Sequence, residues 1–488
     1  MIKKITILLL VLSSYTPLSA QKAFITTWKT TIANESITIP TEGSGYNYTV
    51  DWGDGTTDTN QTGDVVHNYT QAGTYTVKIT GDFPRIYFLK STLENKSKIQ
   101  SIEQWGDGIW SAMASAFSGC KNLRGNATDV PNLSNVTDMS LMFQGATSFN
   151  QDIGSWNVSN VTDMSAMFYD AASFNQDISG WSVSNVTLMS GMFFDATSFN
   201  EDLSGWDVSN VIDMSWMFRE ATSFNEDLSG WDVSNVTSMT SMFNGTASFN
   251  GNIGNWDVSN VTNMNSMFNG ATSFNGDIGN WDVSNVIDMS FMFSGTASFN
   301  GDIGNWDVSN VMSMSFMFSG AASFNKDIGN WDVSNVINMT NMFENTGLYT
   351  ENYDALLAGW SKRSLQNGVK FDAGSSKYCQ GEPARQKLID DFGWSITDGG
   401  KAAGCTLSTS GMETEAFRVW PNPTTQNIQI DFDGEIEQLS IYNLQGAEVL
   451  SQKGGSNKSV DVSVLSSGTY LLKIQTGAGS MVRRIVKK

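Results

Sequence analysis

The sequence predicts a mostly β protein with short helices, in which a long solenoid of repeated coils lies between two small β-sandwiches. Two observations indicate this fold class. A stretch of 25 residues, such as SFNGDIGNWDVSNVIDMSFMFSGTA at 273–297, recurs without insertion through the middle of the chain. A fixed period of this length is typical of solenoids, in which each unit forms one coil. The flanking segments alternate apolar and polar residues, which is the pattern of half-buried strands.

Residues 1–20 have the pattern of a secretory signal peptide. Lys3 and Lys4 precede an apolar run, and the small residues Ser19 and Ala20 close the segment. This order of basic, apolar and small residues predicts export, with cleavage after Ala20. The apolar run is shorter than the roughly 20 residues that span a bilayer. No later segment is long enough either, so we do not expect the protein to span a membrane.

Residues 21–90 are expected to form the first β-sandwich. SITIPT, YNYTVDW and GTYTVKITG read as strands, and Asp54-Gly55 is a turn signal between two of them. The string VDWGDGTTD, followed by HNY and GTYTVKI, resembles the PKD-like, immunoglobulin-type module. Such sandwiches pack a Trp and a Tyr between their sheets. The resemblance implies a spacer or an auxiliary binding domain.

Residues 91–345 contain the repeats. Trp, Phe, Val and paired Met-Phe residues each recur at intervals of 25, as in the Trp series from Trp156 to Trp331. We expect a strand near SFNxDI in each coil and a short helix or 3₁₀ turn over VTDMSxMFxGA. Val286, Met289 and Phe293 have the spacing of the inner face of such a helix. Stacked coils would then align identical residues in columns along the repeat region.

The first coil carries a family resemblance. MASAFSGCKNL at 113–123 resembles the AFxxCxxL signature of BspA-like leucine-rich-repeat surface proteins, and the WDVSNVTDM form resembles a variant repeat of that group. Later coils have Met-Phe in place of Ala-Phe, and Ala or Thr in place of Cys. The resemblance implies a secreted surface protein. It places Cys120 at an inward-facing repeat position, where we expect a buried free thiol.

Residues 346–405 leave the repeat and are expected to cap its end. NYDALLAGWSKRSLQ and ARQKLIDDFGW have helical patterns, and a solenoid needs an atypical end that covers its core. Cys379 and Cys405 both lie here. In an exported protein a disulfide between them is favoured, and two unpaired thiols are the alternative.

The C-terminal 73 residues have a second resemblance. After the polar linker 406–415, the strings WPNPT, IYNLQG, LSSGTYLLKI and RRIVKK in 416–488 resemble the C-terminal sorting domain of type IX secretion cargo. The resemblance implies an interaction with the type IX secretion machinery and passage to the outer membrane exterior of a Gram-negative cell. It also implies later removal of this domain.

Composition argues against several classes of function. The chain has 28 Lys+Arg against 49 Asp+Glu, a formal net charge of −21, whereas nucleic-acid binding needs a basic surface. One histidine, His67, leaves few acid–base constellations, and repeated Asp residues suit turn capping better than catalysis. DWGDGTTD at 51–58 lacks the full series of calcium ligands. We therefore expect no enzyme activity, metal or cofactor.

A variable position before the Met-Phe column is the candidate binding site. It is occupied by Ala166, Gly191, Trp216, Ser241, Ser266, Phe291, Phe316 and Asn341 in successive coils. Exposed aromatic residues in a row suit protein or glycan contact, so Trp216, Phe291 and Phe316 are the candidate binding residues. Partial burial against a neighbouring coil is the alternative.

Together these features predict a secreted, cell-surface protein that acts as a non-catalytic binding or adhesion module for an extracellular protein or glycan. Two alternatives remain open at this point. One is a structural surface-layer component, and the other is a polysaccharide-capturing accessory subunit of an extracellular enzyme system.

Overall fold

The computed structural model describes residues 21–405, 417–432, 435–453, 458–476 and 479–488. It is mostly β with a few short helices and divides into two compact units, Met1–Ala403 and Gly404–Lys488. The predicted signal peptide 1–20 and the linker 406–415 lie outside the described residues.

The first unit begins with two sheets. Six strands come before α1 (Leu93–Lys98), and two further strands, β7 (Ile99–Gln104) and β8 (Arg124–Gly125), follow this helix and extend the larger sheet. The larger sheet has the order β4-β3-β6-β1-β7-β8, and β2 pairs with β5. Trp52 and Tyr69 are fully buried. The first six strands are β1 (Phe24–Thr30), β2 (Glu35–Ile39), β3 (Asn47–Asp51), β4 (Thr57–Gln61), β5 (Val65–Tyr69) and β6 (Gly73–Asp82).

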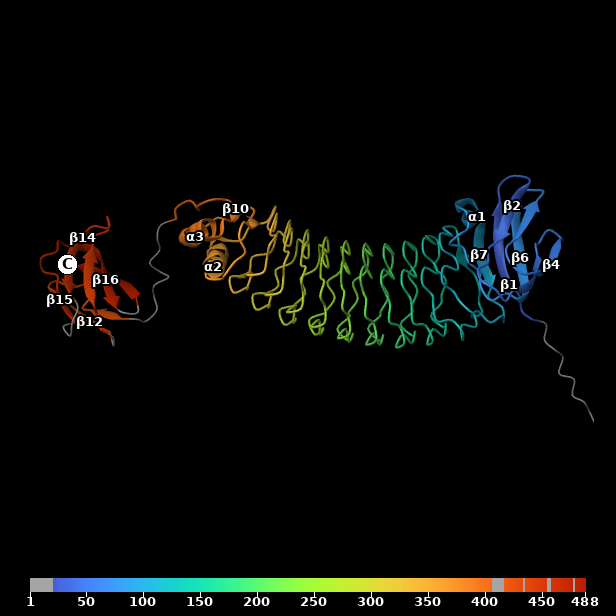
Figure 1. The fold of residues 1–488 in the computed structure, drawn as a ribbon, viewed down its shortest axis with the longest axis horizontal. Coiled ribbons are helices and arrows are strands. Elements are labelled where there is room, and N and C mark those ends of the chain that lie inside the picture. Colours follow the sequence, from blue (N-terminus) through green and yellow to red (C-terminus); the bar gives the residue numbers. More distant parts are fainter. Residues whose placement is uncertain (1–20, 406–416, 433–434, 454–457, 477–478) are drawn as a thin grey trace, which may run out of the picture. The chain divides into compact units, whose positions relative to one another are not determined.

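The N-terminal sheets and the repeats share one hydrophobic core. The backbone N–H of Phe88 donates to the Ser115 carbonyl of the first coil at 3.1 Å. The ring of Phe88 stacks on Phe117, with centroids 6.1 Å apart, and Trp105 meets Trp156 edge to face at 5.3 Å. The sheets thus cover the first coil and end the stack on that side, as Figure 1 shows.

From residue 126 to residue 345 the repeat region is a stack of coils that contains no extended strand. Neighbouring coils are joined by single parallel bridges at every twenty-fifth residue, from Asp138↔Asp163 to Ser313↔Asn338. The expected strand at SFNxDI is therefore wrong, because the bridges lie in the VTD segment. Of the short helix or 3₁₀ turn expected over VTDMSxMFxGA, the helix is wrong, although single turns with i→i+3 hydrogen bonds occur, as from the Met292 N–H to the Met289 carbonyl at 3.2 Å. The segment forms successive turns, because the variable residue within it has a positive φ that no right-handed helix allows.

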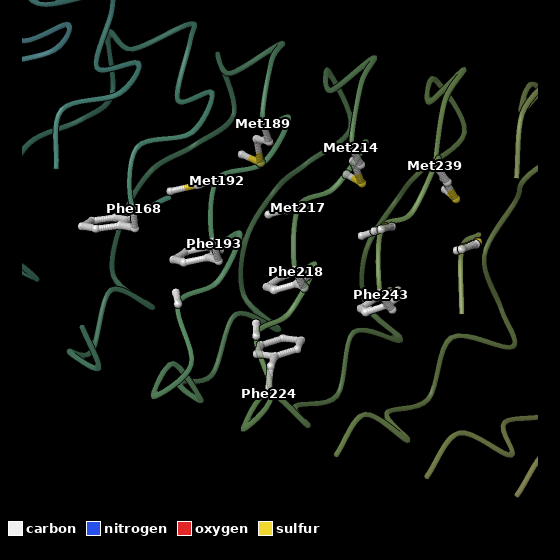
Figure 2. Packing of buried hydrophobic residues seen from close by; sticks show 14 of the residues in the cluster. Phe168, Met189, Met192, Phe193, Met214, Met217, Phe218, Phe224, Met239 and Phe243 are labelled. Atoms are coloured by element: carbon white, nitrogen blue, oxygen red, sulfur yellow. The ribbon is translucent and has the colours of Figure 1, made fainter. Parts of the chain in front are cut away.

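Aromatic and methionine columns fill the stack. Phe168, Phe193, Phe218 and Phe243 lie above one another with ring centroids 5.6–5.7 Å apart, beside columns of Met residues (Figure 2). All four rings are fully buried. The inward positions predicted for the Met-Phe residues are confirmed, although the local backbone differs from the helix that was expected.

Polar ladders hold neighbouring coils in register. From Trp181 to Trp331, each Trp of the column donates its indole N–H to a carbonyl of the preceding coil, as from Trp256 to Leu228 at 2.9 Å. Each SFN asparagine accepts a backbone N–H from the following coil, as Asn250 does from Asn275 at 2.8 Å. Because successive coils repeat both bonds, these indole donors and asparagine acceptors are satisfied coil by coil.

The C-terminal end of the stack is closed by α2 (Thr350–Trp360) and α3 (Glu382–Phe392), with a short parallel pair, β9 (Lys370–Asp372) and β10 (Ser395–Thr397), beside them. Both helices were expected from the sequence. Trp360 continues the indole ladder by donating to the Ile328 carbonyl at 3.2 Å. The cap therefore offers the last coil the same hydrogen bond that another coil would offer.

The second unit is a small β-sandwich with its own core. Its sheets have the orders β11-β12-β15 and β14-β13-β16-β17, and all pairings are antiparallel. Five of its seven strands match stretches that the sequence predicts to be β, namely NIQIDF, QLSIYN, SVDVSVL, GTYLLKIQ and MVRRIVKK, whereas β11 and β14 were not anticipated. The strands are β11 (Arg418–Trp420), β12 (Asn427–Asp431), β13 (Gln438–Tyr442), β14 (Glu448–Lys453), β15 (Ser459–Asp461), β16 (Gly468–Thr476) and β17 (Gly479–Lys487).

Candidate functional site

The variable position has the same backbone conformation in every coil. Its φ lies between 54° and 63° throughout, in the left-handed region that non-glycine residues rarely occupy. In the coils from Ser115 to Phe316, its N–H donates to a carbonyl of the next coil, as from Trp216 to Thr240 at 2.9 Å. The stack imposes this conformation whatever the side chain. The residues are Ser115, Leu141, Ala166, Gly191, Trp216, Ser241, Ser266, Phe291, Phe316 and Asn341.

The three predicted binding residues lie in this one column but not side by side. Trp216 is 44% exposed, which makes it the most accessible of the three. Phe291 and Phe316 are half-buried and stack on each other in adjacent coils, with centroids 4.6 Å apart. Two coils carrying Ser241 and Ser266 separate Trp216 from this pair.

A groove of about 800 Å³ lies next to Trp216. Ala166 and Gly191 leave it open, because neither has a side chain that could fill the space. A Cβ atom added to Gly191 would lie 4.0 Å from both Phe194 and Tyr169, in ordinary contact with the walls. Four coils line the groove, with the residues Ser140, Leu141, Gln144, Asp163, Ser165, Ala166, Tyr169, Ser190, Gly191, Phe194, Trp216 and Arg219.

Three planar groups from successive coils form one wall. Tyr169 and Phe194 stack with centroids 4.3 Å apart and planes inclined by 12°. The guanidinium of Arg219 lies over Phe194, 5.1 Å from the ring centroid, which is cation–π range. The Nε atom of Arg219 is buried and has no hydrogen-bond partner among the described residues.

Sequence reasoning missed this wall, although one signal was available. Arg219 is the only Lys or Arg between Arg124 and Lys326. A single cation in eight coils of an acidic chain points to a local role. The depth of the groove could not be read from the sequence, because it depends on the small residues in two neighbouring coils.

Serine hydroxyls in the groove are not engaged with other described residues. Ser140, Ser165 and Ser190 form no side-chain hydrogen bond with the described part of the chain, although the backbone N–H groups of Ser140 and Ser165 donate to aspartates. At the same repeat position farther along, Ser215 bonds to Ser238 and Ser290 to Ser313, each at 2.7 Å. The groove therefore combines three available hydroxyls with the aromatic wall.

Carboxylates follow the wall residues in sequence. Asp170 comes after Tyr169, Asp195 after Phe194 and Glu220 after Arg219. Burial, and then the nearby Asp195 carboxylate, raise the pKa of Asp170. Among the described residues, none of these carboxylates forms an ion pair with Arg219, so the guanidinium remains available to the groove.

The single histidine lies in the N-terminal sheets. His67 Nε2 is 2.8 Å from the Asp54 carboxylate, and its ring stacks on Trp52 at 4.7 Å. Burial tends to raise the pKa of Asp54, but hydrogen bonds from Thr56 and His67 outweigh it and lower that pKa. Asp58 accepts the indole N–H of Trp52 at 2.8 Å. These contacts hold the predicted DWGDGTTD turn together, and among the described residues no group of His, Cys, Asp and Glu could hold a metal ion.

The cysteines differ in state. Cys379 and Cys405 are disulfide-bonded. Cys120 is free and fully buried, which confirms the prediction for it. Burial raises the pKa of the Cys120 thiol far above its usual range.

Comparison with known proteins identifies the C-terminal unit and the repeats. Residues 418–488 match the Secretion system C-terminal sorting domain, so the chain is a secreted, cell-surface protein that interacts with the type IX secretion machinery. In the described part of the chain, no helix has the length and apolar character needed to cross a membrane. A search of curated proteins finds no match.

The repeat region matches one family in three overlapping stretches, 111–229, 199–297 and 276–371. Together these stretches cover more than half of the 488 residues. They include every coil that lines the groove and the start of the C-terminal cap. The chain therefore belongs to the family described as Mycoplasma protein of unknown function, DUF285.

Proposed function

We propose that this protein is a non-catalytic binding or adhesion module on the outer surface of a Gram-negative cell. The observation that carries the proposal is the variable column. The backbone there is identical in every coil, while the side chain ranges from Gly to Trp. Residues that change on a constant scaffold suit recognition of a partner where they reach the surface, as the exposed Trp216 does.

Other features support the same proposal. The sorting domain accounts for delivery to the surface. The repeats, which resemble those of BspA-like leucine-rich-repeat proteins, supply an extended surface for a protein or glycan ligand. The PKD-like sheets at the N-terminal end cover the first coil and add a second surface. The sole histidine is engaged with Asp54 and Trp52, which supports a protein without enzymatic activity.

The proposal can be tested with glycan and matrix-protein arrays. We expect the purified protein to bind, and a variant with Trp216, Phe291 and Phe316 all changed to Ser to bind less. Serine already occupies this backbone position in three coils, as Ser115, Ser241 and Ser266, so the variant should fold. The matched control changes Ser241, Ser266 and Asn341 to Ala in the same column and should bind as the wild type does.

Other results would point elsewhere. Binding that survives in the aromatic variant would move the contact face away from the column. An absence of any binding, together with self-association in light scattering on dilution, would favour a structural surface layer and contradict the adhesion proposal.

A further inference from the structure

We propose that the groove bounded by Tyr169, Phe194, Trp216 and Arg219 binds an acidic oligosaccharide, with the Arg219 guanidinium holding a carboxylate or sulfate group of the sugar. This inference rests on the proposed binding function and specifies its ligand class and its site. The volume of the groove, about 800 Å³, lies within the range of roughly 300–1,000 Å³ found for ligand sites.

The charge requirement comes from Arg219. It is the only cationic side chain between Arg124 and Lys326, and its Nε is buried without a partner among the described residues. An unpaired buried donor is costly, and a guanidinium binds carboxylate or sulfate-like groups through two parallel hydrogen bonds. An anionic group in the groove would satisfy this donor.

The saccharide requirement comes from the walls. Aromatic faces carry negative charge density, which attracts the polarised C–H bonds on one face of a sugar ring. Tyr169 and Phe194 provide a stacked pair of such rings, and the exposed indole of Trp216 provides another. Ser140, Ser165 and Ser190 add three hydroxyls free to bond with sugar hydroxyls, whereas Ser215 and Ser290 outside the groove are already paired.

A peptide ligand is disfavoured by the backbone of the groove. The N–H groups of Leu141, Ala166 and Gly191 donate to the next coil at 2.8–2.9 Å. An extended peptide usually gains affinity from main-chain hydrogen bonds to a free strand edge. No such edge is open at these positions, so recognition must come from side chains. The side chains that line the groove are chiefly rings, hydroxyls and one guanidinium, together with Leu141, the Gln144 amide and the Asp163 carboxylate, which accepts the Ser165 N–H.

Isothermal titration calorimetry on the full chain tests the inference with four probes. These are a hexamer of galacturonic acid, a heparin hexasaccharide, neutral cellohexaose and a glutamate-rich peptide. We expect one or both acidic sugars to bind at least tenfold more tightly than cellohexaose, and less tightly as salt rises. The galacturonate and heparin arms separate carboxylate recognition from sulfate recognition.

Three variants locate the binding. Arg219→Gln should weaken the acidic sugars at least tenfold and leave cellohexaose unchanged. Gly191→Phe should abolish binding by filling the groove, and the backbone tolerates this residue because Phe291 and Phe316 have nearly the same φ. Ser266→Phe makes the same kind of change outside the groove and should bind as the wild type does. Melting curves should show that all three are folded.

Several outcomes would overturn the inference. Acidic sugars that bind all variants equally, or a peptide that binds more tightly with the same dependence on Arg219, would each exclude an acidic saccharide in this groove. If no sugar binds but the array ligands still bind and depend on the aromatic column, the groove inference fails and the adhesion proposal stands. If nothing binds in either the calorimetry or the arrays, both the groove inference and the adhesion proposal are wrong.

Discussion

The left-handed backbone of the variable column has an energetic cost that depends on the residue placed there. Side chains with a Cβ lose roughly 1–2 kcal/mol per residue in this conformation. Glycine avoids that cost but loses roughly 0.5–1 kcal/mol through its freer unfolded chain. Ala166 and Gly191 occupy this position in adjacent coils, with φ of 54° and 63°, so they allow a direct comparison.

We predict opposite effects for two exchanges at these residues. Ala166→Gly should raise the free energy of unfolding by about 0.5–1 kcal/mol, and Gly191→Ala should lower it by a similar amount. The space beside Gly191 accepts a Cβ, so packing should not mask the backbone effect. Denaturant unfolding curves would measure both. Changes of the same sign would show that side-chain contacts dominate at this position.

The buried thiol of Cys120 should make stability depend on alkaline pH. Its pKa is raised by burial, so it stays protonated in the folded protein while an unfolded cysteine ionises above about pH 8.5. Below that pH the thiol is protonated in both the folded and the unfolded protein, so it does not make the free energy of unfolding depend on pH. Above it, the free energy of unfolding should fall by about 1.4 kcal/mol per pH unit.

The comparison for this prediction is Cys120→Ala, which installs the residue that Ala146 provides in the next coil. The difference between the two proteins, followed by denaturant unfolding from pH 8 to 10.5, should grow with pH. A constant difference across that range would mean that Cys120 ionises in the folded state.

At the scale of elements, the C-terminal cap depends on one carboxylate. Asp354 on α2 accepts the backbone N–H groups of Cys379, Gln380 and Gly381 at 2.7–2.8 Å, just before α3 begins. Negative charge beside the backbone N–H groups at the start of a helix stabilises that helix. This contact fixes α3 against α2 at the end of the stack.

We predict that Asp354→Ala lowers the free energy of unfolding of the first unit by about 2–3 kcal/mol. Asp391→Ala, at an exposed position on α3, should change it by less than about 0.5 kcal/mol. Thermal unfolding monitored by tryptophan fluorescence would compare the two. Equal melting temperatures would show that water replaces the carboxylate without loss.

The period of the repeat could be predicted from the sequence, and its local backbone could not. The identical spacing of Trp, Phe and Met residues specified which side chains stack, and Phe193 and Phe218 do so. Val286, Met289 and Phe293 have helical spacing, yet their coil forms turns. A left-handed residue such as Phe291 interrupts the helix, and propensity patterns carry no signal for that conformation in an aromatic residue.

The candidate site, too, could be predicted only in part from the sequence. Trp216 was predicted as a binding residue because its position varies where the repeat is otherwise constant. The groove was not found, because it requires two small residues and three planar groups in neighbouring coils to be considered together. Its cation, Arg219, was visible only as an exception in composition.

At the scale of the whole first unit, the segments that close the two ends of the coil stack make the contacts that a further coil would make. Trp360 of the cap repeats the indole hydrogen bond, and the N-terminal sheets supply Phe88 and Trp105 to the aromatic columns. In repeat proteins, stability is approximately a sum over units and their interfaces. The number of coils between the two ends is therefore not fixed by either end.

We predict that deletion of residues 251–275 leaves a folded protein. Asn250 then meets Gly276, which restores the sequence SFNGDIG, and every ladder continues with one coil fewer. The melting temperature should change by less than about 5 °C. Deletion of residues 251–262 removes half a coil and should prevent cooperative unfolding. If the protein that lacks the whole coil also fails to fold, the stability of the stack depends on its full number of coils.

The constant backbone of the variable column has a consequence for how the protein can change over time. In the coils from Ser115 to Phe316, the N–H of each residue there is held by the next coil, whether the side chain is Gly191, Trp216 or Ser241. A point mutation in one of these codons therefore alters the outer surface at a cost of about 1–2 kcal/mol or less. Ligand preference can diversify among descendants while the architecture is inherited intact.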